Sequence, residues 1–294
     1  MEVTRNVLET EFNQPATRTV ILRGLEGIGF PLFQVAVRIV TAARPHIIKE
    51  QYEKNFDGPT YAKGFTRDLK FEYMWFMEEF YHRLFEEGKL QGKTLIDVGC
   101  GPSLRAPLVA SRYGCEVVCA DLLETNRNFV QNWLDKGHDA FDYSDQFKHV
   151  AQLEGNDDFG YLEERVKKSV KEVIFCDILA DNPIHPRPSQ QFDIVTSSLV
   201  LDAYPDQADY LKGAKAISSL IRPGGYLAFG SSIGGTYYKV GDKTLPSSNV
   251  DSAVAKKAFI EAGLKVLQIC EYYFKEQVTG TDSKGFFTLY AIKL

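Results

Sequence analysis

Residues 94–104, TLIDVGCGPSL, decide the fold class of this chain. The apolar run at 94–98 fits a buried strand, and Gly99 and Gly101 follow it just before a predicted helix at 105–113. Glycine at both positions lets the backbone approach a ligand closely, where any Cβ would clash. A strand, a glycine turn and a helix in this order indicate a parallel α/β sheet with a ligand site at the end of the strand.

A second strand, at 116–120, leads into Asp121, which stands 22 residues after Gly99. A carboxylate there can accept hydrogen bonds from both hydroxyls of a ribose, so the pair predicts a nucleoside site. The third glycine of the dinucleotide fingerprint is missing, because Leu104 takes its place. The pattern therefore favours S-adenosylmethionine, an adenosine ligand without phosphates, over a dinucleotide. An ordinary strand–turn–helix junction with a capping carboxylate would show the same residues, so the remaining motifs have to decide.

Short apolar strands alternate with helices along the rest of the chain. Strands are predicted at 94–98, 115–120, 173–176, 191–198, 225–230, 265–273 and 285–292. This alternation predicts an α/β fold with a doubly wound, mostly parallel seven-stranded sheet. The last two strands form a hairpin, which suits an antiparallel edge strand inserted into the sheet.

Two domains are expected from the change of pattern along the chain. Residues 1–90 are predicted to form a helical N-terminal extension that caps the site, since apolar residues at 71–85 recur at helical spacing. Residues 91–294 are predicted to form the S-adenosylmethionine-binding domain, with an insertion at 137–172 and a substrate hairpin at 231–248. The hairpin has its turn signal at Gly241-Asp242.

The composition excludes several classes of partner. With 294 residues, 44% of them hydrophobic, the chain can bury a large core. The net charge is −5 and there is no basic tract, so the clustered Lys and Arg that bind nucleic acid or an anionic membrane are missing. The apolar run at 27–37 is too short to span a bilayer. We therefore expect a small-molecule partner and no nucleic acid. For residues 27–37, packing onto the catalytic domain or a second subunit is favoured over the alternative of an interfacial membrane helix.

The use of cysteine and histidine points to a reducing compartment and to a site without metal. The five cysteines include no C-x-x-C pair and are odd in number, which is typical of reduced core thiols in a cytoplasmic protein. The five histidines never stand at metal-ligand spacing, so no metal is expected. Monomer and homodimer both stay open.

Five stretches resemble one known family, the small-molecule N-methyltransferases that act on nicotinamide, phenylethanolamine and indolethylamine. LIDVGCGPS, DLLETNR, LVLDAYPD, LIRPGGYL and TGTDSKGFF are similar to the family's LIDIGSGPT, DFLEVNR, LCLDAxxPD, LLKPGGFL and TGVDDVKGVFF, in this order. The resemblance covers residues 55–294, while residues 1–54 have no counterpart. It implies a Rossmann-like methyltransferase fold, with S-adenosylmethionine as cofactor.

The resemblance implies cofactor contacts in the first two of these stretches. Gly99 and Cys100 would approach the methionine part of the cofactor, and Gly101 would shape the loop. Cys100 replaces a serine of the family, which a backbone contact tolerates. Asp121 would hold the ribose, with Asn126 near the same end.

Further cofactor contacts are implied on later strands and in the N-terminal segment. Asp177 would accept a hydrogen bond from the adenine amine beside Ile178, and Ser198 would contact the cofactor at the end of the fourth strand. The family's F-x-P-x-x-Y pattern is met by residues 56–61 with the proline displaced by one, so Tyr61 is the candidate and Tyr52 a weaker one.

Two further tyrosines of the family are replaced here. They correspond to Thr66 and Arg105 of this chain. An aromatic face stabilises a cationic ligand by about 0.5–2 kcal/mol. The aromatic wall of the cofactor site is therefore expected to differ from that of the family.

The acceptor site shows the largest departure from the amine-methylating relatives. They use two acidic residues, of which one corresponds to Asp202 and the other to Ser231. Asp202 would orient the acceptor and take up its proton, directly or through water, as the catalytic residue. Serine cannot supply the second charge, which argues against nicotinamide and phenylethanolamine as preferred acceptors. Tyr238 and Ser247 correspond to positions of the substrate wall.

Together, the sequence predicts a cytoplasmic N-methyltransferase that uses S-adenosylmethionine to methylate a small amine or heteroaromatic nitrogen. An S-methyltransferase that acts on thioethers is one alternative, because sulfur needs no proton removal. A non-catalytic adenosine-ligand binding protein is another. A dehydrogenase would share the fold, but the missing third glycine argues against it.

Overall fold

The computed structural model describes residues 8–9, 20–21, 44–67, 72–136 and 139–294. The chain divides into two compact units, Met1–Arg44 and Pro45–Leu294. In the first unit the described residues form two short strands, β1 (Leu8–Glu9) and β2 (Val20–Ile21), which pair antiparallel. These four residues are strand where helix was predicted. The apolar run at 27–37 lies outside the described residues.

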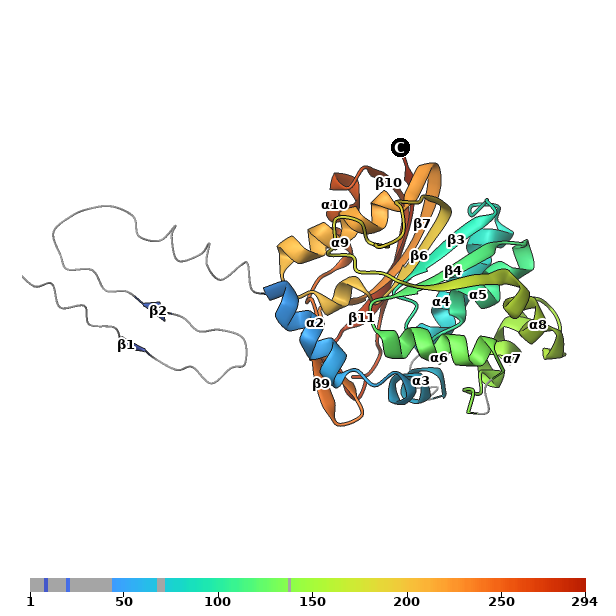
Figure 1. Ribbon diagram of the computed structural model, residues 1–294, viewed down its shortest axis with the longest axis horizontal. Coiled ribbons are helices and arrows are strands. Elements are labelled where there is room, and N and C mark those ends of the chain that lie inside the picture. Colours follow the sequence, from blue (N-terminus) through green and yellow to red (C-terminus); the bar gives the residue numbers. More distant parts are fainter. Residues whose placement is uncertain (1–7, 10–19, 22–43, 68–71, 137–138) are drawn as a thin grey trace, which may run out of the picture. The chain divides into compact units, whose positions relative to one another are not determined.

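The second unit is built on a seven-stranded sheet (Figure 1). Its strands are β3 (Thr94–Val98), β4 (Glu116–Asp121), β5 (Val170–Phe175), β6 (Phe192–Ser198), β7 (Ile221–Ile233), β10 (Leu264–Tyr273) and β11 (Gly285–Lys293). They lie in the order β10-β11-β7-β6-β3-β4-β5. β11 runs antiparallel to both of its neighbours, while β7, β6, β3, β4 and β5 pair in parallel. The predicted fold class is confirmed; the inserted antiparallel strand is β11, and β10 forms the edge.

Helices cover both faces of this sheet, so its strands are apolar on both sides. One core cluster contains Leu95 together with residues of α4 (Glu72–Glu86), α5 (Arg105–Ala110), α6 (Glu124–Leu134), α7 (Ser144–Leu153) and α8 (Gly160–Ser169). The other contains Ile96 together with residues of α9 (Gln207–Ser219) and α10 (Ser252–Glu261). Because successive strand residues point to opposite faces, neighbours in β3 enter different clusters.

The predicted insertion at 137–172 is integrated into the domain. Its described part holds α7 and α8, and β5 already begins at Val170. Leu162 and Val166 of α8 are fully buried, which gives this charged helix an apolar face against the sheet.

The helices before the sheet are α2 (Arg44–Asn55), α3 (Gly58–Arg67) and α4, so residues 44–67 and 72–86 are mainly helical, as predicted for this segment. They belong to the same compact unit as the sheet. Met77 and Leu84 of α4 are fully buried in its core. This part of the predicted extension is therefore packed into the domain.

Local sequence explains where the best-defined helices and turns lie. α9 begins after Asp206, whose side chain accepts from Ala208 N at 2.8 Å, and α10 begins after Asp251, which accepts from Val254 N at 2.9 Å. Such caps satisfy N–H groups that the first helical turn leaves free. Gly224, near the start of β7, has φ +75°.

The strand order places a switch between β3 and β6, because the chain winds from β3 toward β5 and then returns to β6 on the other side. In open α/β sheets, ligands bind at the carboxyl ends of strands beside such a switch. The loop with Gly99 and Gly101 follows β3 at this point.

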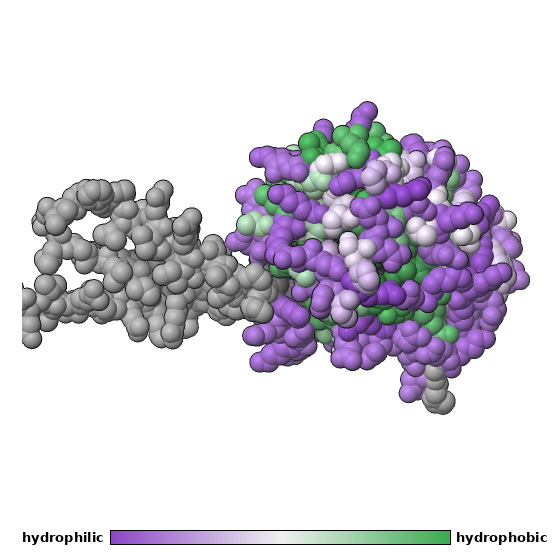
Figure 2. All heavy atoms as spheres, turned by 45° about the horizontal axis from the view of Figure 1, so that its top comes forward, coloured by the Kyte–Doolittle hydropathy of each residue, from purple (hydrophilic) through white to green (hydrophobic). Residues whose placement is uncertain are grey.

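The surface of the second unit is largely hydrophilic on the face seen in Figure 2, where hydrophobic residues gather in two limited areas. Large exposed apolar side chains of the described residues are few: Tyr161, Ile260, Leu267, Tyr273 and Leu294. Within the described ranges, every helix is too short or too polar to cross a membrane.

Candidate cofactor and acceptor site

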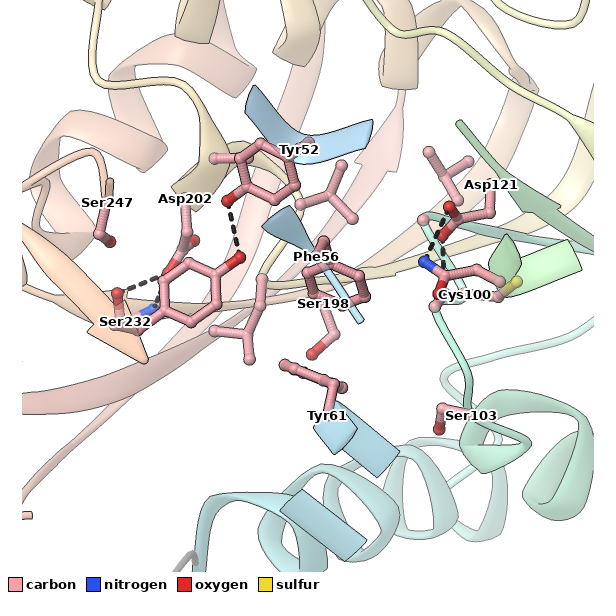
Figure 3. Close-up of a pocket in the computed structure, with 18 of the residues that line it drawn as sticks. Tyr52, Phe56, Tyr61, Cys100, Ser103, Asp121, Ser198, Asp202, Ser232 and Ser247 are labelled. Carbon is pink, nitrogen blue, oxygen red and sulfur yellow. Dashed lines mark hydrogen bonds between the residues drawn. The ribbon is translucent and has the colours of Figure 1, made fainter. Parts of the chain in front are cut away.

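A cavity of about 220 Å³ lies at the carboxyl ends of β3, β4 and β6, beside the switch in strand order. Figure 3 shows Asp121 and Cys100 on one side of it, Asp202, Ser232 and Ser247 on the opposite side, and Tyr61 and Ser198 between. Among the predicted site residues, those that line the cavity are Tyr61, Gly99, Cys100, Gly101, Asp121, Asn126, Ile178, Ser198, Asp202, Tyr238 and Ser247. The fold thus gathers residues from distant strands around one space.

The glycine loop turns its own N–H groups back onto the protein. Gly99 N and Cys100 N donate to the carbonyl of Ala120, at 2.7 and 3.0 Å, and Gly101 N donates to Asp121 Oδ2 at 2.8 Å. A phosphate site needs such N–H groups free to point at the ligand. The loop therefore allows close approach of its backbone but offers no cradle for a pyrophosphate, consistent with the missing third glycine.

Gly99 is required by both its conformation and its surroundings. Its φ is +68°, and a Cβ there would lie 2.0 Å from Cγ2 of Val200. Gly101 has φ +57°, but a Cβ on it would meet no atom within 4 Å. Gly101 therefore needs glycine only for its positive φ, whereas Gly99 also needs it to avoid a clash with Val200.

Asp121 is buried and already holds three protein donors. Its Oδ1 accepts from Leu123 N at 2.8 Å and Asn126 Nδ2 at 3.1 Å, and its Oδ2 accepts from Gly101 N at 2.8 Å. Burial raises the pKa of this carboxyl. A carboxylate offers about four lone-pair sites, so room for about one further donor remains on Oδ2. That is fewer than the two ribose hydroxyls expected from the sequence.

Asn126 supplies a second acceptor beside Asp121. Its Oδ1 is buried and receives no hydrogen bond from any residue that the structure describes. Gly58 at the start of α3 lies against it, since a Cβ there would be 2.7 Å from that oxygen. A buried acceptor without a donor is costly, so this atom calls for a donor from a ligand or from water.

The structure does not bring Asp177 to the cavity. Its Oδ1 accepts from Leu179 N at 2.9 Å, and its N–H donates to the carbonyl of Pro183 at 2.8 Å. An aspartate that bonds to the backbone two residues on forms a local turn, which uses one oxygen of this carboxylate. Ile178 beside it is buried and lines the cavity together with Cys176.

An aromatic wall from α2 and α3 closes one side of the cavity. Phe56 lies between Tyr52, at a ring distance of 6.1 Å, and Tyr61, at 5.0 Å. The Tyr52 hydroxyl is 2.7 Å from the hydroxyl of Tyr238 on β8. Burial raises the pKa of Tyr61 to about 12. These phenols are therefore neutral, and their rings face a ligand that enters the cavity.

Asp202 on the short 3₁₀ helix η2 (Leu201–Ala203) is fixed by two serines. The Ser231 hydroxyl donates to its Oδ1, while Ser232 N and the Ser232 hydroxyl donate to its Oδ2 at 2.9 and 2.5 Å. Burial raises the pKa of Asp202. The carboxylate is thus held in one orientation at the edge of the cavity.

Ser231 was predicted to lie at the acceptor site, but it does not line the cavity. It is fully buried, and its hydroxyl is engaged by Asp202. Ser232, the next residue of β7, takes a place in the wall instead. The strand predicted at 225–230 continues to Ile233, so both serines lie inside β7. The burial of each serine depends on packing that the local sequence does not reveal.

The predicted substrate hairpin forms from β8 (Tyr237–Val240) and β9 (Lys243–Pro246), with Gly241 at φ +60° in its turn. Asp282 holds it in place: its carboxylate accepts from Thr236 N at 2.7 Å, from Thr236 Oγ1 at 2.6 Å and from Tyr237 N at 3.2 Å. The stretch TGTDSKGFF therefore ties this hairpin to the strand β11.

The sequence reasoning missed a strained residue in the wall. Leu199 directly follows β6, lines the cavity and has φ +60°. Its N–H donates to the carbonyl of Gly230 at 2.9 Å. This conformation costs a non-glycine residue about 1–2 kcal/mol and tends to occur at functional sites. Leucine gives no sign of it in the sequence.

Two positively charged side chains of α2 and β8, Lys49 and Lys239, and the buried Arg105 also line the cavity. The acidic members of the wall are Asp97, Asp121 and Asp202. Among the residues that the structure describes, no group of His, Cys, Asp and Glu could hold a metal ion.

Sequence comparisons with known proteins identify one family. The sequence profile described as "NNMT/PNMT/TEMT family" matches residues 44–294. Human nicotinamide N-methyltransferase (Homo sapiens) is 32% identical over 207 residues, covering 70% of this chain and 78% of that protein. Indolethylamine N-methyltransferase of Oryctolagus cuniculus is 30% identical over 229 residues, covering 75% and 86%. Human phenylethanolamine N-methyltransferase is 30% identical over 217 residues, covering 71% and 77%.

A solved structure shows the same fold at low sequence identity. Magnesium protoporphyrin IX methyltransferase from Synechocystis, with bound S-adenosylhomocysteine, matches with a TM-score of 0.53 at 13% identity. The match covers 85% of this chain and 100% of that one. At this identity the likeness supports the fold alone.

Proposed function

The chain belongs to the NNMT/PNMT/TEMT family, and from this premise we propose that it transfers the methyl group of S-adenosylmethionine to the nitrogen of a small amine or heteroaromatic acceptor. The main support is that two carboxylates line the same cavity. Asp121 is buried at the position expected to bind a ribose, and Asp202 is held in one orientation by hydrogen bonds. The three relatives matched by sequence are all named N-methyltransferases, which favours nitrogen over sulfur.

The cavity fits S-adenosylmethionine better than a dinucleotide. Asp121 Oδ2 has room for one hydroxyl, and Asn126 Oδ1 lacks a donor that a second ribose hydroxyl would supply. Ile178 would flank the adenine. The N–H groups of the glycine loop are used within the protein, so the site has no need of a phosphate. When bound, the cofactor supplies an electrophilic methyl group on a positively charged sulfur.

Aromatic and backbone groups would position that sulfur. The rings of Phe56 and Tyr61 lie along the middle of the cavity, where an aromatic face stabilises a positive charge by about 0.5–2 kcal/mol. Ser198 and the loop at Gly99 and Cys100 also line the cavity. Holding both reactants near attack distance is the main contribution that a protein makes to such a displacement.

Asp202 would prepare the acceptor. An amine attacks only when it is neutral, so a carboxylate beside it can bind its N–H and take up the proton. The hydrogen bonds from Ser231 and Ser232 keep this carboxylate from rotating. Tyr238 and Ser247 would line the acceptor pocket, while Ser231 would act by orienting Asp202.

Supporting observations bear on compartment and partners. All five cysteines are free thiols, which fits the predicted cytoplasmic location. We propose a small-molecule acceptor, with monomer or homodimer as the assembly.

The test is incubation of the full chain with methyl-labelled S-adenosylmethionine and a pooled panel of primary amines, pyridines and thioethers. Transfer of label to a nitrogen, located by mass spectrometry and NMR of the product, is the expected result. Label found only on sulfur would overturn the choice of nitrogen, and failure to bind S-adenosylhomocysteine would overturn the function itself.

A further inference from the structure

The hydroxyl of Tyr210 is a buried polar group outside the cavity. Tyr210 lies on α9 and is fully buried, and its ring belongs to the core cluster that also contains Leu201 of η2. Its hydroxyl has no hydrogen-bond partner of normal geometry among the residues that the structure describes. A buried donor without an acceptor is costly, so this hydroxyl calls for a partner close by.

Two side chains of the acceptor site act on this phenol. Burial raises the pKa of Tyr210, the charge of Asp202 raises it further, and a hydrogen-bonding interaction with Ser231 lowers it. The groups are therefore close, although the contact with Ser231 lies outside normal hydrogen-bond geometry. The packing agrees, since a Cβ on Gly213 of α9 would lie 2.6 Å from Cδ2 of Leu201, the residue before Asp202.

Ser231 has the capacity to accept a hydrogen bond from Tyr210. A serine hydroxyl carries one donor and two acceptor lone pairs. The donor of Ser231 is used on Asp202 Oδ1, which leaves the lone pairs for another group. Ser231 is fully buried, so an acceptor in the cavity does not compete for them.

We propose, on the basis of the proposed function, that Tyr210 is a positioning residue of the acceptor site: its hydroxyl donates to Ser231 Oγ and thereby holds the Ser231 hydrogen on Asp202. Successive hydrogen bonds polarise one another, so the chain from Tyr210 through Ser231 strengthens the bond to the carboxylate. Asp202 would thus be kept charged and in one orientation by neutral hydroxyls from behind the cavity. This relay stands where the amine-methylating relatives have a second acid.

Three other phenols act on Asp202 from within the cavity. They are Tyr52, Tyr61 and Tyr238, which line it. Burial raises the pKa of each, and the charge of Asp202 contributes, so all three are neutral at neutral pH. Tyr210 is not among the lining residues, so its hydroxyl reaches an acceptor only through other side chains.

The experiment tests Tyr210→Phe, which removes only the hydroxyl, in the wild type and in Ser231→Ala. The first readout is kcat/KM on the best amine acceptor across pH. A hydrogen bond to a carboxylate favours its charged form, so its weakening in Tyr210→Phe should raise the midpoint by about 0.3–1 pH unit and lower kcat/KM about two- to tenfold below it. In Ser231→Ala the relay is already broken, so adding Tyr210→Phe should change kcat/KM by about twofold or less.

A second readout needs no turnover. NMR of protein labelled with ¹³C at its aspartate carboxyl groups follows the titration of Asp202, whose signal is identified by its loss in Asp202→Asn. Its midpoint should rise in Tyr210→Phe. The matched control is Tyr290→Phe, which removes the hydroxyl that donates to the carbonyl of Lys89 at 2.6 Å outside the cavity. This control should lower the melting temperature but leave the midpoint of Asp202 unchanged.

An unchanged midpoint in Tyr210→Phe, or an equal rise with and without the Ser231 hydroxyl, would overturn the role of Tyr210 and leave the proposed function intact. If the wild type transfers no methyl group to nitrogen while the NMR midpoint still rises in Tyr210→Phe, the proposed function fails and the hydrogen-bond relay to Asp202 stands.

Discussion

Replacement of Asp202 by asparagine gives the most informative test of the acceptor chemistry. The carboxylate accepts from Ser231 at one oxygen and from Ser232 N and its hydroxyl at the other. In Asp202→Asn, the new NH₂ group can face Ser231, whose hydroxyl can rotate to accept, while the remaining oxygen still accepts from Ser232 N. The change therefore removes the charge and the proton acceptor but keeps the local hydrogen bonds.

For an amine acceptor we expect kcat/KM to fall about 10²- to 10⁴-fold, the range for a lost general base. At 1.36 kcal/mol per factor of ten, this corresponds to roughly 2.7–5.5 kcal/mol of transition-state stabilisation. Because burial raises the pKa of Asp202, the wild-type kcat/KM should rise with pH as this group loses its proton, and the variant should lack that step.

The assay is steady-state kinetics on the best nitrogen acceptor across pH. The matched control is Asp206→Asn, since Asp206 caps α9 outside the cavity and asparagine is an equally good cap. A pyridine nitrogen or a thioether carries no proton to remove, so the loss there should be about tenfold or less. A loss of that small size on a confirmed amine would refute the role of Asp202 as base.

Three further predictions concern the cofactor side and the core. Asp121→Asn should raise the Kd of S-adenosylhomocysteine, measured by calorimetry, about 10- to 100-fold. The variant should also have a lower melting temperature, because three N–H donors converge on this carboxylate and one of them must lose its acceptor. Gly99→Ala should destabilise by roughly 2–6 kcal/mol in urea unfolding, since its Cβ would overlap Val200, whereas Gly101→Ala should cost only about 1–2 kcal/mol for its positive φ. Glu78 has a pKa of about 8 in the folded chain against 4.5 in the unfolded chain, so its contribution to stability falls as pH rises between these values. Between pH 6 and 9, the free energy of unfolding of Glu78→Gln should therefore rise by roughly 2–3 kcal/mol relative to that of the wild type. A difference that stays constant with pH would contradict the raised pKa of this buried carboxyl.

The backbone around the glycine loop could be predicted from the sequence. The strand at 94–98 has the predicted bounds, and Asp121 closes β4 beside the glycine loop. Both features depend on residues close in sequence: an apolar run, a glycine with positive φ and a carboxylate that accepts a nearby N–H. Such short-range constraints act whatever the rest of the chain does.

The hydrogen-bond partners of the predicted side chains could not be read in this way. Asp177 stands at the expected place in the sequence, yet its carboxylate bonds to Leu179 N in a local turn. Ser231 and Ser232 are neighbours of the same type, and only their burial distinguishes the residue that orients Asp202 from the one in the wall. A motif gives the residue type and the backbone position, but the direction of a polar side chain follows from which donors reach it.

The sequence by itself determined the alternation of strands and helices, the glycine loop, the two carboxylates and the family, because periodicity and motif spacing are properties of short segments. Tertiary structure alone decided that Tyr52 meets Tyr238 across 186 residues, that Asp121 has capacity for only about one more donor, and that Arg105 enters the cavity beside a buried Glu78. These contacts form only when separate elements pack on one sheet, and their energies depend on burial, which no single segment fixes on its own.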